Sequence, residues 1–217
     1  MERQEKESAP VTVKMAATVV GVAFFGSVIL VTLVDDFLLA NFVVPGNTSA
    51  LARDVEANPS VLVLASIGYL AVLLLDMVVG MGLYVVLKPA NRWLAALTGA
   101  LRLLYAGVLM IAVLALLVQA VGIHGFATIK LVGYVFFACH IFLLGYLVLV
   151  CGYIPKPLGV LLIVASLTYV VFFIDIPLSE NASVLIMLIM AVAEVALCTW
   201  LLVKRRSLPE AQPGDIK

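Results

Sequence analysis

The chain has 217 residues, of which 65% are apolar and only 12% are charged, against roughly 25% charged residues in an average globular protein. A soluble protein of this composition lacks the polar groups needed to cover its surface, so the sequence predicts an all-α, polytopic membrane protein whose main partner is the lipid bilayer. Thirteen basic residues balance thirteen acidic ones, and no basic surface indicates a nucleic-acid partner.

The chain divides into a polar tail over 1–12, a transmembrane domain over 13–203 and a polar tail over 204–217. At about 20 residues per spanning helix, the middle part has room for six helices in one bundle. Turn signals such as Pro45-Gly46 and Pro89 separate the apolar runs. The first run is too long for a cleaved signal core and is expected to remain as the first helix. The predicted helices cover about 13–37, 60–87, 93–121, 129–151, 158–176 and 184–203.

The distribution of the basic residues predicts the orientation. One set of termini and turns holds Arg3, Lys6, Lys14, Lys88, Arg92, Lys156, Lys204, Arg205 and Arg206, whereas the opposite set holds Arg53 and Lys130. Short loops rich in Lys and Arg stay in the cytoplasm, so both termini are expected there, in agreement with six spans. The expected location is the cell membrane.

Four ionisable residues are predicted to share one depth in the bilayer. They lie on four different helices, each ten to twelve residues from the cytoplasmic end, and are Asp76, Arg102, His140 and Glu194. At 1.5 Å per residue, this distance is roughly 15–18 Å, which is about the bilayer midplane. Each such group costs about 2.5–3.5 kcal/mol on insertion, so the four are expected to face the bundle interior and to pair.

The short turn between the second and third helices makes Asp76 and Arg102 the natural ion pair, and His140 with Glu194 is a candidate second pair. The set carries a charge of −1 with a neutral histidine and zero with a protonated one, so it can hold a titratable proton.

Secondary candidates extend this polar layer. Tyr69 and Tyr105 lie at helical spacing from Asp76 and Arg102, and Asp175, with Asp35 or Asp36, is placed near the outer boundary. A solvated position at the membrane surface explains these three aspartates equally well.

No cofactor or metal site is predicted. The sequence has no phosphate-binding glycine loop, no His-Glu-x-x-His and no Gly-x-Ser-x-Gly motif. His124 falls in a predicted outer turn, at another depth than His140, so neither a bis-histidyl haem nor a multi-histidine zinc site is expected. The cysteines are Cys139, Cys151 and Cys198, and no pair of them has metal-type spacing.

Three segments resemble an uncharacterised bacterial and archaeal multipass family catalogued as domain of unknown function 4386. They are 83–92 (LYVVLKPANR), 140–161 (HIFLLGYLVLVCGYIPKPLGVL), which contains the specific Gly-Tyr-Ile-Pro hairpin, and 194–204 (EVALCTWLLVK). The resemblance implies a six-helix membrane protein and no settled activity. Relatives are expected to carry an acid shortly after the arginine of the third helix. Here Leu103, Leu104 and Tyr105 follow Arg102, which favours Asp76 as its partner.

Three functions fit these residues. The polar layer binds a proton or a small lipophilic or anionic ligand, in transport or sensing. Alternatively, a protonated Asp76 or Glu194 acts as general acid in an intramembrane isomerase or cyclase of a lipophilic substrate, although no metal or nucleophile motif supports an enzyme. Third, the ion pairs only specify helix packing in an accessory subunit. Small residues such as Gly80, Gly145 and Gly159 permit close packing within one chain or in a homo-oligomer.

Overall fold

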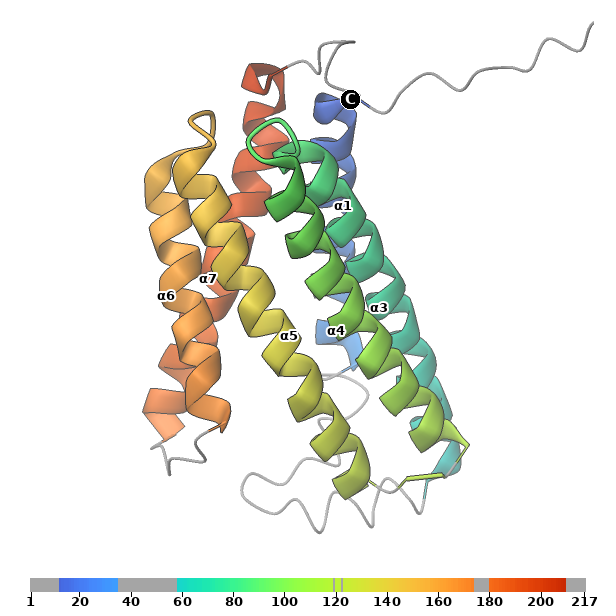
Figure 1. Ribbon diagram of the computed structural model, residues 1–217. Helices are drawn as coiled ribbons and strands as arrows, with labels where there is room; N and C mark the ends of the chain where they lie inside the picture. Colours follow the sequence, from blue (N-terminus) through green and yellow to red (C-terminus); the bar gives the residue numbers. More distant parts are fainter. Residues whose placement is uncertain (1–11, 35–57, 119, 122, 174–179, 210–217) are drawn as a thin grey trace, which may run out of the picture.

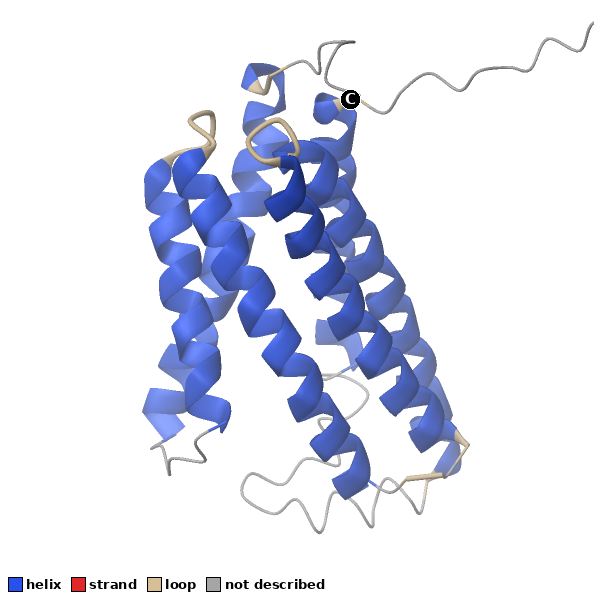
Figure 2. Ribbon diagram, viewed as in Figure 1, coloured by secondary structure: helices blue, strands red, loops and turns tan. Residues whose placement is uncertain are grey.

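The computed structural model describes residues 12–34, 58–118, 120–121, 123–173 and 180–209, and in these ranges all regular structure is helical (Figure 2). The elements are α1 (Val13–Thr32), α3 (Pro59–Leu87), α4 (Arg92–Leu117), α5 (Ile123–Val150), α6 (Lys156–Phe173), α7 (Glu180–Lys204) and the short 3-10 helix η2 (Arg205–Ser207). The predicted all-α class is therefore confirmed.

Four of these helices are long and apolar enough to cross a membrane, by length and composition. They are α1, α3, α4 and the part of α5 from Thr128 to Val150.

Capping side chains fix where two of the helices, α1 and α4, begin. The Thr12 side chain accepts a hydrogen bond from the Met15 amide at 3.2 Å, and Asn91 Oδ1 accepts one from the Leu94 amide at 3.0 Å. Such caps satisfy amides that have no partner inside the helix.

Several helix boundaries differ from the sequence prediction. The predicted outer turn over 122–128 is corrected, because α5 is already helical from Ile123. No proline interrupts 123–128, and the one glycine in it, Gly125, costs a helix only about 1 kcal/mol. Likewise α4 ends at Leu117 instead of 121, and α7 begins at Glu180 instead of 184. The predicted ends at 37 and 176 and the two polar tails, except Thr12 and 204–209, lie outside the described residues.

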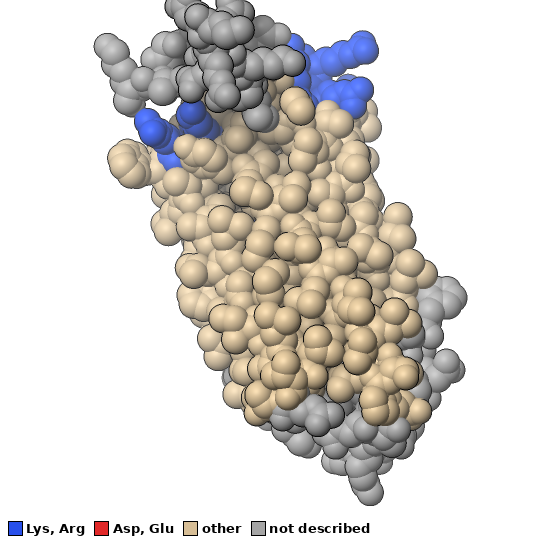
Figure 3. Space-filling model, turned by 90° about the vertical axis from the view of Figure 1, so that its right-hand side faces the viewer, with Lys and Arg blue, Asp and Glu red and all other residues tan. Residues whose placement is uncertain are grey.

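The helices form a ring. Each helix packs against the next described one, and α7 returns to pack against α1 (Figure 1). The beginning of α1, the end of α7, and the α3–α4 and α5–α6 turns lie at the same end of the bundle. We name it the charged end, because it carries Lys14, Lys88, Arg92, Lys156, Lys204, Arg205 and Arg206. Figure 3 shows a flank on which blue side chains gather only at one end and the rest of the described surface carries no charge.

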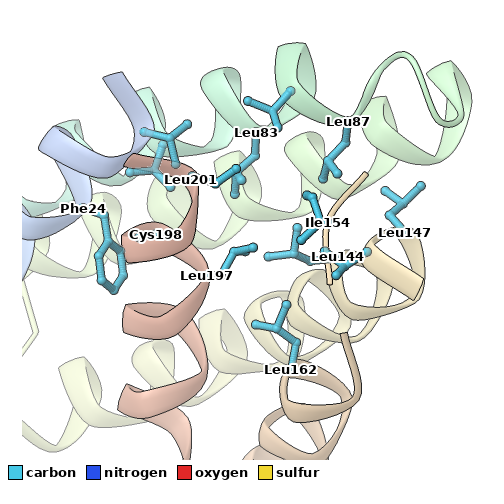
Figure 4. Close-up of a cluster of buried hydrophobic side chains, with 14 of the residues drawn as sticks. Phe24, Leu83, Leu87, Leu144, Leu147, Ile154, Leu162, Leu197, Cys198 and Leu201 are labelled. Carbon is cyan, nitrogen blue, oxygen red and sulfur yellow. The ribbon is translucent and has the colours of Figure 1, made fainter. Parts of the chain in front are cut away.

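The interior next to the charged end is apolar and closely packed (Figure 4). We call this region the leucine core, which consists of Phe24, Leu83, Leu87, Leu144, Leu147, Ile154, Leu162, Leu197, Cys198 and Leu201. Ile154 reaches it from the α5–α6 turn, where Gly152 has a φ of 76° that favours glycine. The neighbouring Tyr153 hydroxyl donates a hydrogen bond to the Val86 carbonyl at 2.8 Å. The turn is therefore fastened to α3.

Candidate functional site

The four ionisable residues predicted at one depth come together in the structure. Asp76 lies on α3, Arg102 on α4, His140 on α5 and Glu194 on α7, each near the middle of its helix. We call these four residues the polar cluster. Arg102 is at its centre, because its guanidinium contacts the other three side chains. The polar cluster thus ties together four of the described helices.

The ion pair expected between Asp76 and Arg102 is confirmed. Arg102 Nη2 donates to Asp76 Oδ1 at 2.5 Å, and both side chains are buried. Gly80, one turn after Asp76 on α3, makes room for the arginine stem. A Cβ atom at Gly80 would lie 3.4 Å from Arg102 Cβ, which is already the limit of ordinary contact. The α3–α4 hairpin therefore holds both partners in place.

The second predicted pair is corrected. His140 and Glu194 do not pair with each other but both contact Arg102 Nη1, which lies 3.2 Å from Glu194 Oε2 and 3.3 Å from His140 Nε2. His140 Nδ1 lies 2.8 Å from the Thr98 carbonyl oxygen, which only accepts, so Nδ1 carries the proton. Nε2 then has a free lone pair that accepts from the guanidinium. A carboxylate and this lone pair are both acceptors, and Arg102 supplies the donor that each needs.

Aromatic rings close the site on one side. The Phe137 ring centroid is 5.2 Å from Arg102 Cζ, within cation–π range. Phe137 also packs against the rings of Tyr105 and Tyr169, with centroids 4.5 and 5.3 Å away. Among the described residues, Arg102 Nε has no hydrogen-bond partner. The guanidinium is therefore held in a largely apolar pocket by two carboxylates, an imidazole and a ring face.

The charges of the polar cluster do not balance. One guanidinium faces two carboxylates and a neutral imidazole, so the formal charge is −1 when both acids are ionised. Exposure differs between the members: the side chains of Arg102, Asp76 and Glu194 are 3%, 9% and 15% exposed, and His140 is fully buried. Glu194 is thus the titratable member with the greatest access to the outside.

The secondary candidate residues do not lie together in one site. Tyr105 belongs to the aromatic wall beside Phe137. Tyr69 packs against a separate apolar group between α3 and α4 that includes Leu73 and Ala106. Asp175 lies outside the described residues, as do Asp35 and Asp36.

Sequence reasoning missed two contributors to the site. The Thr98 backbone carbonyl orients His140, and this role depends on no side chain, so no residue type signals it. Phe137 covers Arg102, and its position one turn before His140 on α5 was an available signal.

Comparison with known proteins shows one family. The sequence model of a protein family described as a domain of unknown function (DUF4386) matches residues 19–121 and 115–204, in two overlapping segments. An uncharacterised protein of Archaeoglobus fulgidus is 34% identical over 146 residues, which are 66% of this chain and 85% of that protein. No solved structure matches.

Proposed function

We propose that this chain, which belongs to the DUF4386 family of unknown function, is a multi-pass cell-membrane protein whose polar cluster takes up and releases a proton, as in proton-coupled transport. The proposal has two parts. The first is a six-span topology with both termini in the cytoplasm. The second is an exchangeable proton on the carboxylates around Arg102.

The placement of the basic residues supports the topology. Seven of the nine Lys and Arg residues in the described ranges form the charged end, and Lys130 and Arg102 are the other two. Cytoplasmic loops attract such residues, so the charged end faces the cytoplasm. The closed ring of six described helices, with the first start and the last end on one side, supports an even number of crossings.

One observation carries the proton site: two carboxylates share one buried guanidinium. An unbalanced negative charge is costly in a membrane interior, and one proton on a carboxylate removes it. Arginine does not release its proton. His140 is a poor acceptor of a proton here, because its Nε2 lone pair already faces the guanidinium. The exchangeable proton therefore belongs to the two acids.

Glu194 is the better carrier of the two. Its oxygen is 3.2 Å from the guanidinium and its side chain is more exposed, whereas Asp76 is held at 2.5 Å. The contacts also favour a proton over an anionic ligand, because both terminal nitrogens of Arg102 already contact acceptors of the chain. Among the described residues only Nε of the guanidinium lacks a partner, and it is buried, so an anion at the terminal nitrogens would have to displace one of these acceptors.

Infrared difference spectroscopy tests the proton site. The purified protein in lipid nanodiscs is taken from alkaline to acidic pH, and the carbonyl stretch of a protonated carboxylic acid is recorded. The other acids of the chain also contribute to this band when protonated. We therefore expect the same band in the wild type and in Lys88→Gln, and a component of it to be missing in Glu194→Gln, which keeps the shape and one oxygen acceptor. A band of equal intensity in Glu194→Gln, or no band in the wild type, contradicts the assignment.

Cysteine labelling tests the topology separately. In a background with Cys139, Cys151 and Cys198 replaced by alanine, Lys88→Cys at the α3–α4 turn should react with a membrane-impermeant maleimide only after the cells are permeabilised. Labelling of intact cells would reverse the orientation and leave the proton site to be judged on its own experiment.

A further inference from the structure

A groove lies between α6 and α7 at the charged end. It has a volume of about 510 Å³, is open along one side, and is lined almost entirely by apolar atoms. Ala196, Thr199, Trp200 and Val203 form its α7 wall, a spacing that places them along one stripe of the helix. Sites for small molecules measure about 300–1,000 Å³, so the groove is large enough for part of a ligand.

The groove is separate from the polar cluster. Glu194 is two residues before Ala196, and at 3.6 residues per turn the two side chains point roughly 160° apart, on nearly opposite sides of α7. The inner face of α7 is buried in the leucine core, through Leu197 and Leu201. Thr199 and Val203 are exposed. The groove therefore opens away from the bundle interior, toward the surrounding medium.

Positive charge is concentrated at one end of the groove. Lys204 lines it, and Lys156 stands between the lining residues Pro155 and Pro157. Both lysines are exposed. The described stretches 151–158 and 195–209 contain four basic residues and no acidic one. From Lys204 to Ala196 the helix descends roughly 12 Å, so the cationic end leads into an apolar channel along α7.

We propose that this groove binds one anionic phospholipid, with its phosphate at Lys156 and Lys204 and one acyl chain along the α7 stripe. The inference rests on the topology proposed above, which places the charged end at the cytoplasmic membrane surface. Juxtamembrane lysines attract anionic lipids, and a tryptophan such as Trp200 suits the boundary between headgroups and acyl chains. A second copy of the chain is a poorer occupant, because a two-fold contact would bring the same cations together.

Tryptophan quenching tests this lipid site. The chain has two tryptophans, and Trp93, at the start of α4, is 82% exposed. The variant Trp93→Phe therefore leaves Trp200 as the only indole. The variant is placed in liposomes containing brominated phosphatidylglycerol or brominated phosphatidylcholine with the same chains. Two lysines near one phosphate favour the anionic lipid on the order of tenfold, so half-maximal quenching should need about tenfold less of it.

Two further variants separate the site from general surface charge. Lys156→Gln with Lys204→Gln in the Trp93→Phe background should bring the two lipids to equal quenching. Lys88→Gln, at the same end but outside the groove, should keep the preference. Equal quenching of Trp93→Phe itself overturns the lipid site and leaves the topology standing. If neither lipid quenches Trp200, the membrane placement of this end fails as well.

Discussion

The leucine core and the polar cluster are equally well buried but are held by different forces. In the leucine core, Leu147 is fully buried among side chains whose contacts have no preferred direction (Figure 4). In the polar cluster, His140 is also fully buried, yet both of its ring nitrogens have a specific partner at a fixed distance. Close packing tolerates many apolar sequences, whereas the polar contacts require these residues.

This difference shows how the helices are rotated in the bundle. Apolar side chains on α5 are found both inside and outside: Leu144 is buried, while Phe142 and Val150 are about half exposed. Lipid is as apolar as leucine, so hydrophobicity alone does not decide which face turns inward. His140 decides it, because its side chain can reach Thr98 and Arg102 only from one rotation of the helix.

The largest effect is expected where the polar cluster is broken at its centre. In Arg102→Met, two carboxylates and the histidine lose their shared donor while the volume of the side chain is roughly kept. Breaking a buried ion pair by removing one partner costs about 3–5 kcal/mol. We expect the free energy of unfolding, measured by reversible unfolding in mixed micelles, to fall by this amount. A variant too unstable to be purified should instead fail to accumulate in the membrane.

The partners of the arginine provide the control for this variant. Adding Asp76→Leu and Glu194→Leu to Arg102→Met replaces the charged network by apolar residues and should recover most of the lost stability. This triple variant should also lack the component of the infrared band that Glu194 supplies. If Arg102→Met alone is as stable as the wild type, the polar cluster does not hold the four helices together.

A smaller effect is expected in the leucine core. Leu147→Ala removes a fully buried side chain, and such truncations cost about 2–5 kcal/mol in water-soluble proteins. The lower end applies here, because lipid reduces the hydrophobic part and leaves mainly lost packing. The matched control is Val150→Ala, at a position that is 52% exposed on the same helix. Unfolding in mixed micelles should separate the two, and equal losses would contradict the assigned inner face of α5.

The two regions also differed in how far sequence could predict them. Depth along each helix follows from counting residues, and this found all four members of the polar cluster. The short turn between α3 and α4 predicted the Asp76–Arg102 pair. The partner of His140 did not follow, because it depends on which nitrogen carries the proton, and a backbone carbonyl of α4 decides that. The predicted helix ends differed from the observed ones where no proline marks the boundary, as at Ile123, where α5 begins. Helices of uniform hydrophobicity do not indicate which of their apolar residues fill the leucine core.

The smallest effect is expected at the edge of the leucine core, where Tyr153 joins the α5–α6 turn to α3. Tyr153→Phe removes the hydrogen bond to the Val86 carbonyl and should cost about 0.5–1.5 kcal/mol. Tyr153 lies outside the helices, and burial raises the pKa of its hydroxyl above the usual value. The unfolded chain therefore loses this proton first, since an unperturbed tyrosine ionises near about pH 10.

The pH dependence of Tyr153→Phe distinguishes loss of the hydroxyl hydrogen bond from a change in packing, because a change in packing does not depend on pH. With the folded-state pKa raised, the contribution of Tyr153 is fully present below the unfolded pKa and is lost as the pH rises toward the folded value. The difference in unfolding free energy between wild type and Tyr153→Phe should thus be constant at neutral pH and shrink in alkaline solution. A difference that does not change with pH would mean that the loss comes from altered packing around the ring in Tyr153→Phe, and not from the hydroxyl bond to Val86.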